Sequence, residues 1–334
     1  FPTRRSSDLY VLHRKDRWQV AHIYRRRAKP EEQAPQYSHI HFTSDLEEVL
    51  NDPLVKLVVV CTHADSHFEY AKKALEAGKN VLVEKPFTPT LAEAKTLFAL
   101  AKSKGLTVSP YQNRRFDSCF LAAKKAIESG KLGEIVEVES HFDYYRPESP
   151  TQPGRPQDGA FYGLGVHTMD QIISLFGRPD HASYDIRSLR NPANPDDTFE
   201  AQLYYGNLKA IVKTSHLVKI DYPKFIVHGT KGSFVKYGID QQETSLKAGI
   251  MPGDANFAAD DSVSYLEYVN DAGDTVKEQW QAERGDYGRV YDALYQTLTN
   301  GTPNFVKETE ALTNMELLER AFEQPAPATI SLTK

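Results

Sequence analysis

The chain has 334 residues, of which 40% are hydrophobic and 25% are charged. That length predicts two domains, and the composition excludes collagen, a disordered polymer and a disulfide-rich miniprotein. The net charge of -5 gives no field to hold nucleic acid or an anionic membrane. Cys61 and Cys119 form no metal-ligand motif, no apolar run is long enough to span a membrane, and two distant cysteines favour a reducing, cytoplasmic location.

The first residues do not look like part of a fold. Residues 1–9 are polar and basic, with neither strand alternation nor a helical stripe. We expect them to be foreign to the fold, although an ordinary frayed tail would look the same. Residues 18–24 then predict a short strand, and the spacing of Ser44 and Glu47 predicts a capping box at the start of a helix through Leu50.

Strands and helices alternate over residues 10–115. Val55–Cys61 has the composition of a strand buried on both faces, and residues 80–83 and 107–108 predict two more strands. Apolar stripes predict helices over 67–77 and from the Thr90 capping box to Gly105. The alternation predicts a doubly wound parallel sheet, the α/β Rossmann domain of dinucleotide enzymes.

Strands dominate residues 116–334. Helices are predicted over 119–129, 167–176, 287–300 and 308–324, and strands over 135–144, 198–205, 208–218, 225–228, 233–237, 264–269 and 275–280. Turn residues between the strands predict a large, open, mostly antiparallel sheet of the α+β class, with the closing helices packing back on it.

The glycine-rich turn that binds pyrophosphate in Rossmann domains is missing. No glycine precedes Gly78, so we expect the first strand and its glycine loop to be absent and the domain at 10–115 to be truncated. The second strand ends in Arg25 and Arg26 instead of an acidic residue. Arginine there favours the 2′-phosphate of NADP, with NAD or a plain basic surface turn as the alternatives.

Polar residues follow three of the predicted strands, where ligands bind in open parallel sheets. The segment Thr62–His67 could meet a cofactor, or Asp65 or Ser66 could simply cap the next helix. Glu84-Lys85-Pro86 could place a lysine in a cleft to hold a hydroxyl, or form a surface ion pair. The amide and guanidinium groups of Ser109–Phe116 could bind a polyol or a cofactor ring, or form a polar domain junction.

A glycine-rich segment, Gly159–Asp170, opens the helix predicted at 167–176. His167 and Asp170 lie three residues apart and share a helical face. One His and one Asp are too few for a metal site, so we expect no metal. A histidine at a helix start suits a general acid or base, although a structural role is the common alternative.

Together these segments resemble the Gfo/Idh/MocA family of NAD(P)-dependent oxidoreductases. The resemblance rests on Glu84-Lys85-Pro86, on Gln112–Phe116, on Gly165–Asp170 and on the closing Leu317-Leu318-Glu319. It implies hydride transfer between nicotinamide and a sugar or inositol-like polyol, and a homo-oligomer formed through the antiparallel sheet. It also implies roles for individual residues: catalysis by Lys85 and His167; dinucleotide contacts from Thr62, His63, His67, Glu84 and Gln112 beside Arg25 and Arg26; and substrate contacts from Asn113, Arg115, Tyr145 and Asp170.

One departure from that family keeps other functions open. Many members carry Asp four residues before the catalytic His, where this chain has Gly163. A non-catalytic regulator that binds dinucleotide or sugar is therefore an alternative, and a defective fragment is a third possibility. The leading hypothesis is an NADP-preferring oxidoreductase acting on CH–OH groups.

Overall fold

A computed structural model describes residues 10–27, 37–148 and 154–332 of the chain. The chain divides into two compact units, one running to Tyr111 and including Gly288–Phe305, the other comprising Gln112–Tyr287 and the chain from Val306 onward. Residues 1–9, which the sequence predicts to be foreign, lie outside the described residues.

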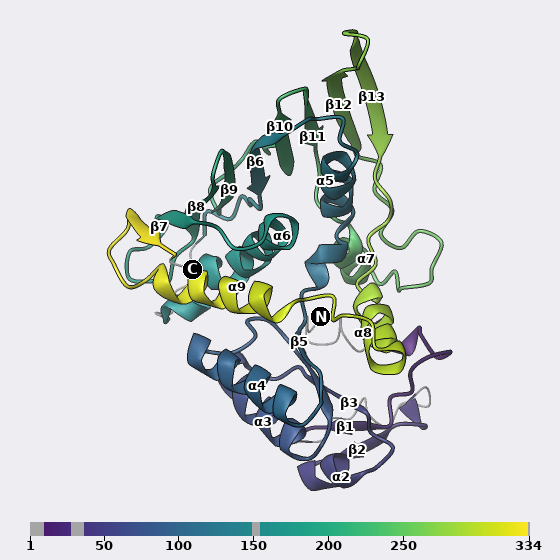
Figure 1. The fold of residues 1–334 in the computed structure, drawn as a ribbon. Coiled ribbons are helices and arrows are strands. Elements are labelled where there is room, and N and C mark those ends of the chain that lie inside the picture. The colour runs from purple at the N-terminus through teal and green to yellow at the C-terminus, as the bar shows by residue number, and fades with distance from the viewer. Residues whose placement is uncertain (1–9, 28–36, 149–153, 333–334) are drawn as a thin grey trace. The chain divides into compact units, whose positions relative to one another are not determined.

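The first unit holds two separate parallel sheets (Figure 1). Strand β1 (His22–Tyr24) pairs with β2 (His41–Thr43), whereas β3 (Leu57–Val60), β4 (Asn80–Val83) and β5 (Val108–Pro110) form the second sheet. The helices are α2 (Leu46–Asn51), α3 (His67–Glu76), α4 (Leu91–Ser103) and α8 (Arg289–Asn300), with the 3₁₀ turn η4 (Ala64–Ser66) ahead of α3. Parallel strands joined through helices, together with the mainly antiparallel second sheet, confirm the predicted fold class.

Local capping signals place the helices of this unit. The predicted capping box at α4 is confirmed, because the Thr90 hydroxyl accepts from Glu93 N while the Glu93 carboxylate accepts from Thr90 N. At α2 the predicted Ser44 cap is wrong. The N-cap is Asp45, whose carboxylate accepts from Glu47 N at 2.9 Å, and a carboxylate is at least as good a cap as a hydroxyl.

The strand predicted at Val55–Cys61 is shorter than expected and is not buried on both faces. Of β3 only Val60 is buried, while Leu57, Val58 and Val59 are half-buried. The neighbouring β4 is buried along Val81–Val83 because it has a partner strand on each side. Strand β3 lies at a sheet edge and borders a cavity, which explains its exposure.

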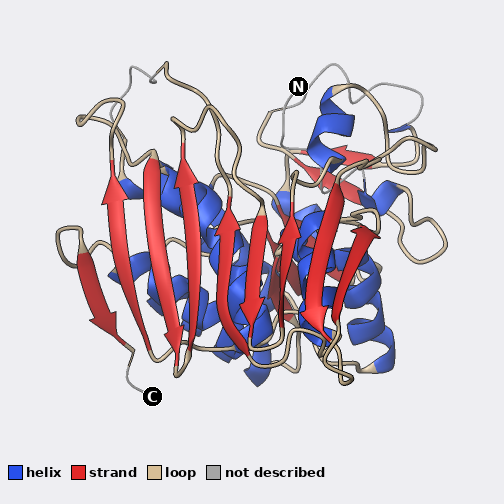
Figure 2. Ribbon diagram, turned by 90° about the horizontal axis from the view of Figure 1, so that it is seen from above, coloured by secondary structure: helices blue, strands red, loops and turns tan. Residues whose placement is uncertain are grey.

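The second unit is built on a nine-stranded sheet (Figure 2). Its order is β13-β12-β11-β10-β6-β9-β8-β7-β14. The strands are β6 (Ile135–His141), β7 (His181–Arg187), β8 (Thr198–Tyr205), β9 (Leu208–Ser215), β10 (Phe225–Gly229), β11 (Gly232–Lys236), β12 (Val263–Val269), β13 (Thr275–Gln281) and β14 (Ala328–Ser331). The central pair β6–β9 is parallel, so the sheet is mixed, and the sequence did not predict β7 or β14.

Helices cover one face of this sheet (Figures 1 and 2). Helix α5 (Ser118–Glu128) packs on β10 and β11, α6 (Val166–Phe176) packs on β9, and α9 (Glu308–Arg320) lies against α6. The unit also contains α7 (Gln242–Lys247), which the sequence did not predict, and the short turns η5 (Asn113–Phe116), η6 (Pro156–Asp158) and η7 (Phe161–Gly165). Among the helices of both units, none in the described ranges is long and apolar enough to cross a membrane.

The Thr90 cap gives a direct stability test. Thr90→Ala leaves the Glu93 N–H without its side-chain acceptor and should lower the free energy of unfolding by about 1 kcal/mol. Thr96→Ala, on the exposed middle of the same helix, is the matched control and should have no such cost, because alanine is the better helix former. Urea unfolding followed by circular dichroism measures both; equal stability of the two variants would contradict the capping role.

Candidate functional site

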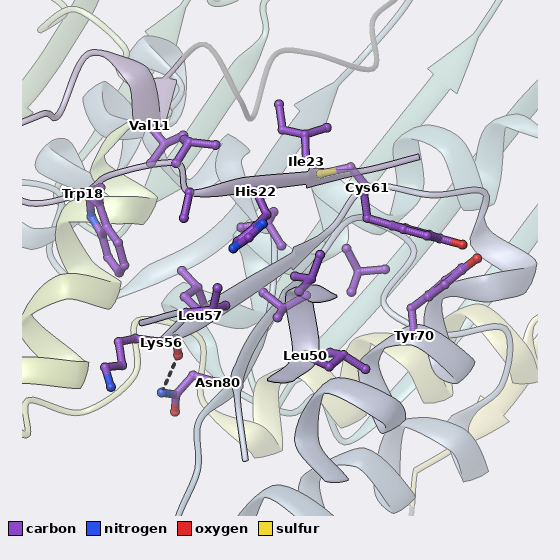
Figure 3. A pocket seen from close by; sticks show the side chains of 18 of the residues that line it. Val11, Trp18, His22, Ile23, Leu50, Lys56, Leu57, Cys61, Tyr70 and Asn80 are labelled. Carbon is purple, nitrogen blue, oxygen red and sulfur yellow. Dashed lines mark hydrogen bonds between the residues drawn. The ribbon is translucent and has the colours of Figure 1, made fainter. Parts of the chain in front are cut away.

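The carboxyl ends of β1 and β3 meet at one cavity of the first unit (Figure 3). The cavity has a volume of about 1480 Å³ and is lined at these strand ends by Arg25, Arg26, Thr62 and His63. Four residues predicted to contact the dinucleotide, from segments far apart in the sequence, therefore border a single space. A guanidinium pair beside hydroxyl and imidazole groups is a setting suited to a phosphate-bearing ligand.

The turn after β3 is held by its own side chains. The Ser66 hydroxyl contacts the carbonyl oxygen of His63 and the hydroxyl of Thr62, each at 2.8 Å, and the Asp65 carboxylate lies 3.3 Å from the imidazole of His63. Ser66 stands at the N-cap of α3 but makes no capping bond. The prediction that Ser66 serves as a simple cap is therefore wrong, because its hydroxyl bonds to the turn instead. A capping role for Asp65 stays a prediction.

His67 ties the ends of β3 and β4 together. Its Nδ1 lies 2.8 Å from the carbonyl oxygen of Pro86 and its Nε2 lies 3.1 Å from that of Thr62. The ring is 1% exposed, and this burial lowers the pKa of His67. The ring therefore fixes the positions of the Thr62 and Pro86 backbones. A direct contact between His67 and a dinucleotide stays a prediction.

Glu84, Lys85 and Pro86 form the turn that His67 holds. The N–H of Glu84 donates to Val60 O at 2.9 Å, which extends the β3–β4 pairing by one step. The Glu84 carboxylate accepts from the backbone N–H of Lys85 at 3.3 Å, and the Lys85–Pro86 peptide bond is cis. Both charged side chains are half-buried. The turn thus has a fixed backbone from which the lysine projects.

In the second unit, His167 sits on a continuous helix. The sequence predicts a tight glycine loop ahead of it, but Phe161–Gly165 is a π-helical turn that runs directly into α6, so His167 does not stand at a free helix start. The carboxylate of Asp196 accepts from Phe161 N at 2.7 Å and anchors this turn. Burial raises the pKa of Asp196 to about 6. A Cβ on Gly159 would collide with Asp196, so glycine there permits the close approach.

Two predicted substrate residues are bound to each other. The Arg115 guanidinium donates two hydrogen bonds to Asp170, both at 2.7 Å, and a third to Glu310 at 2.9 Å. Burial works against the charge of Arg115, but the two carboxylates outweigh it and raise the pKa of the guanidinium. The three buried side chains join η5, α6 and α9 and so fix the helix that carries His167. A substrate contact by Arg115 or Asp170 stays a prediction.

The other predicted residues of this unit differ in exposure. Gln112 is buried, and no described residue bonds to its Oε1. Asn113 is half-buried in η5, while Tyr145 is half-exposed, with the Lys219 ammonium 4.3 Å from the centre of its ring. Gln112 therefore offers an unused acceptor, which is suited to a ligand donor.

Sequence reasoning missed Asp196 and Glu310, the carboxylates that position the His167 helix. Both act across long sequence separations, 35 residues to Phe161 and 195 residues to Arg115. No local pattern marks either one. Within the described ranges no cluster of three or more His, Cys, Asp or Glu side chains could hold a metal ion.

Comparison with known sequences gives the family. Residues 5–112 match the model described as the oxidoreductase family, NAD-binding Rossmann fold, and residues 124–329 match the model for the family's C-terminal alpha/beta domain. The chain belongs to the Gfo/Idh/MocA oxidoreductase family. The uncharacterized oxidoreductase YhhX of Escherichia coli is 83% identical over 325 residues, covering 97% of this chain and 94% of that protein.

More distant relatives carry more informative names. A protein of Bacillus subtilis named scyllo-inositol 2-dehydrogenase (NADP(+)) IolW is 34% identical over 312 residues, covering 92% of this chain and 87% of that protein. Among solved structures, that of an oxidoreductase from Bacillus cereus is 48% identical and superposes with a TM-score of 0.97, covering 100% of this chain and 97% of that one. The family and its two-part fold are therefore shown.

The contacts of the His67 ring with the carbonyls of Thr62 and Pro86, called the His67 clamp below, predict that the free energy of unfolding depends on pH. The neutral ring carries one N–H, so His67→Ala removes the donor to one of the two carbonyls and the packing of the ring against the other, and should cost about 1–3 kcal/mol of unfolding free energy at pH 7.5. Because the folded pKa is lowered, the unfolded chain binds the proton more readily, so the stability from this group is lost as pH falls below the ordinary value of 6.5. The difference in unfolding free energy between the wild type and His67→Ala should therefore become smaller as the pH falls from 7.5 to 5.5.

Denaturant titrations at both pH values measure this effect. His63→Ala is the matched control, since that imidazole lies one turn earlier and its side chain is 62% exposed. A difference between wild type and His67→Ala that is the same at both pH values would contradict the clamp.

Proposed function

We propose that the chain is an NADP-preferring oxidoreductase that transfers a hydride between the nicotinamide and a ring carbon of a sugar or inositol-like polyol. The observation that carries the proposal is the pair Arg25 and Arg26 at the carboxyl end of β1, lining the same cavity as Thr62 and His63. A relative named as an NADP-dependent inositol dehydrogenase supports the same reading.

The residues present suit part of a dinucleotide. Two guanidinium groups match the charge of a ribose 2′-phosphate, and Thr62, His63 and Gln112 offer hydrogen-bonding groups for the rest. We place Glu84 in the same contact set because it follows β4 directly. No glycine precedes Gly78, so the described residues do not include a glycine-rich turn for the pyrophosphate. When bound, the cofactor supplies or accepts the hydride.

We assign the proton chemistry to Lys85 and His167. In the oxidative direction Lys85 would hold the hydroxyl oxygen and stabilise the charge that develops on it, while His167 would accept the hydroxyl proton. The His67 clamp fixes the turn that carries the lysine, and the Arg115–Asp170–Glu310 cluster fixes the helix that carries the histidine. Asn113, Arg115, Tyr145 and Asp170 complete the proposed substrate contacts.

We also propose a cytoplasmic homo-oligomer formed through the face of the nine-stranded sheet opposite its helices. Exposed apolar side chains on β12, Tyr265 and Val269, support an interface there. Between them on the same strand stands Glu267, which pairs with Lys277 of β13 at 2.9 Å. Mixed apolar and charged groups suit a surface that is exposed in the single chain.

The arginine pair predicts selective loss of NADPH binding. The double variant Arg25→Gln/Arg26→Gln should lower the affinity for NADPH by roughly 10–100-fold, because charge-assisted hydrogen bonds to the 2′-phosphate are lost. The affinity for NADH, which lacks that phosphate, should not change. Lys56→Gln, a charge change at the opposite end of β3 on the same cavity, is the control. Fluorescence titration of both cofactors measures the ratio; equal weakening of NADH and NADPH would contradict the assignment.

The role proposed for Lys85 predicts that its replacement lowers turnover without lowering the affinity for the cofactor. With the polyol that the wild type turns over fastest, Lys85→Met should lower kcat by about 10²–10⁴-fold, and the affinity for NADPH should stay the same. His167→Asn should act in the same way. Lys102→Met, an exposed change on α4, is the control and should not alter kcat. Normal turnover by Lys85→Met would overturn the role.

One observation favours a second function, a regulator that binds dinucleotide without turning substrate over. Gly163 replaces the Asp that many family members carry, and Asp170 cannot take its place in a relay because both of its oxygens bond to Arg115. A Cβ at Gly163 meets nothing within 4 Å, so the first side-chain atom of a Gly163→Asp variant causes no clash. Turnover that rises in this variant supports the enzyme; NADPH binding without turnover in both forms supports the regulator.

A further inference from the structure

Two chain segments meet at one corner of the second unit, just beyond the ends of β6 and β9. Arg146 N donates to His216 O at 2.8 Å and Val218 N donates to Tyr144 O at 3.0 Å, so the two segments run side by side. The guanidinium of Arg190 donates to the carbonyl oxygen of Arg146 at 2.8 Å. The backbone that carries Arg146 is therefore held from two sides.

Two cations of this corner lie over aromatic rings. The Arg146 guanidinium lies 3.9 Å from the centre of the Tyr144 ring, and the Lys219 ammonium lies 4.3 Å from the centre of the Tyr145 ring. Both charged side chains are exposed, and no carboxylate in the described ranges lies within ion-pair distance of either. Stacking holds an arginine in place while its planar fork of N–H groups still matches the oxygens of a carboxylate or a phosphate.

The buried carboxylates of this corner are engaged by other groups. Asp197 accepts from both the backbone N–H and Nε of Arg190, each at 3.0 Å, and Asp143 accepts from Ser215 N at 2.8 Å. Neither carboxylate therefore offsets the charges of the two stacked cations. A pair of exposed cations without ion-pair partners attracts anions from solution.

The corner lies on the face of the sheet that α6 covers. Along β9 the buried side chains of Ala210 and Val212 face the helices, and by strand alternation Thr214 and His216 do so as well. The His216 ring meets the Tyr144 ring edge to face, with the ring centres 5.6 Å apart. Tyr144 and the arginine stacked on it therefore lie on the same face as the helix that carries His167.

A chain of contacts within the second unit connects the corner to that helix. Gln171, one helical turn after His167, donates from Nε2 to Arg114 O at 2.6 Å. The Arg114 guanidinium lies 4.8 Å from the centre of the Phe142 ring, and this ring lies 5.7 Å from that of Tyr144. The corner and the proposed general base thus belong to one packed group of side chains.

Polar atoms without hydrogen bonds lie on the same strip of β9. Thr214 is 1% exposed, and no described residue bonds to its Oγ1 or to Nδ1 of His216. Buried polar atoms of this kind are rare and point to a bound polar molecule. Burial lowers the pKa of His216, and the guanidiniums of Arg190 and Arg146 lower it further. The neutral ring is therefore a natural reporter of any negative charge placed at the corner.

We propose that Arg146, with Lys219 beside it, binds an anionic group of the substrate, so that the substrate is an acidic sugar: a ring polyol that carries a carboxylate or a phosphate. The step from anion to substrate rests on the proposed oxidoreductase function, whereas the anion site rests on the stacked cations alone. The anion takes no part in hydride or proton transfer. It is held equally in substrate and transition state, so the contact should lower KM and leave kcat unchanged.

Proton NMR of the His216 ring tests the anion site without cofactor or turnover. The probes are glucuronate, glucose 6-phosphate and neutral glucose, each titrated into the full chain at equal ionic strength, and His216→Gln assigns the ring signals. An anion beside Arg146 favours the imidazolium, so the acidic sugars should move these signals toward their protonated positions at pH 7. The Kd of the better acid should be at least about tenfold below that of glucose, and the ranking of the two acids tells carboxylate from phosphate.

Variants of Arg146 show whether the anion binds where proposed. Arg146→Gln should abolish the preference for acidic sugars, whereas Arg146→Lys, which keeps the charge without the planar fork, should keep part of it. Lys231→Gln is the control, since this exposed lysine follows β10 and pairs with Asp271. The control should keep the full preference. Equal affinity for acids and glucose in the wild type, or an unchanged preference in Arg146→Gln, overturns the anion site.

Kinetics separate this inference from the proposed function. With NADP and an acidic sugar, Arg146→Gln should raise KM by about tenfold and leave kcat unchanged, and it should not affect KM for neutral polyols. Turnover of neutral polyols without any preference for acids would overturn the acidic substrate and leave the oxidoreductase function standing. Acid-selective binding without hydride transfer to or from any sugar would contradict the oxidoreductase function and leave the anion site standing.

Discussion

A buried parallel strand is stable only when the backbone groups on both of its edges have partners. Strand β4 meets this condition, with β3 on one side and β5 on the other, and Val81–Val83 are buried. Strands β1 and β3 each meet it on one side only, and both line a cavity of about 1480 Å³. The partial exposure of β3 and the division of the described strands into two sheets both reflect this one-sided pairing.

The candidate site depends on residues that never need to touch a ligand. The buried ring of His67 lies within hydrogen-bond distance of carbonyls at the ends of β3 and β4, so that it packs the turn bearing Lys85 against the end of β3. In the second unit, Asp196 anchors the π-helical turn, and Glu310 joins Arg115 and Asp170 in a buried cluster. Buried ion pairs of this type add little net stability but are costly to break, so they hold a helix in one position. The proposed catalytic groups are thus carried on rigid supports.

Much of the fold could be predicted because its signals are local. Strand β4 and strand β8 were predicted to the residue, since each is a compact apolar or alternating run, and the Thr90 box is a pattern of four residues. Strand β7 was missed because its residues His181–Arg187 are mostly polar and only Ala182 and Tyr184 are buried. The parallel pairing of β6 with β9 depends on chain order in the sheet, which no local pattern encodes.

The site was predictable to a smaller extent. Residues after strand ends could be found because parallel strands share one edge, and four of these residues do border one cavity. The Arg115–Asp170 pair could not be foreseen, because it joins residues 55 positions apart and gives two apparent ligand-binding groups a structural partner.

Transfer of deuterium from the cofactor to a polyol tests the oxidoreductase proposal most directly. NADPH carrying deuterium at the reactive ring carbon would be incubated with the protein and a panel of cyclic polyol ketones, and the products analysed by mass spectrometry. We predict one deuterium on the carbon that becomes CH–OH, and at least about 100-fold slower labelling when Lys85 is replaced by Met. Protein that binds NADPH and transfers deuterium to none of the ketones would contradict the account.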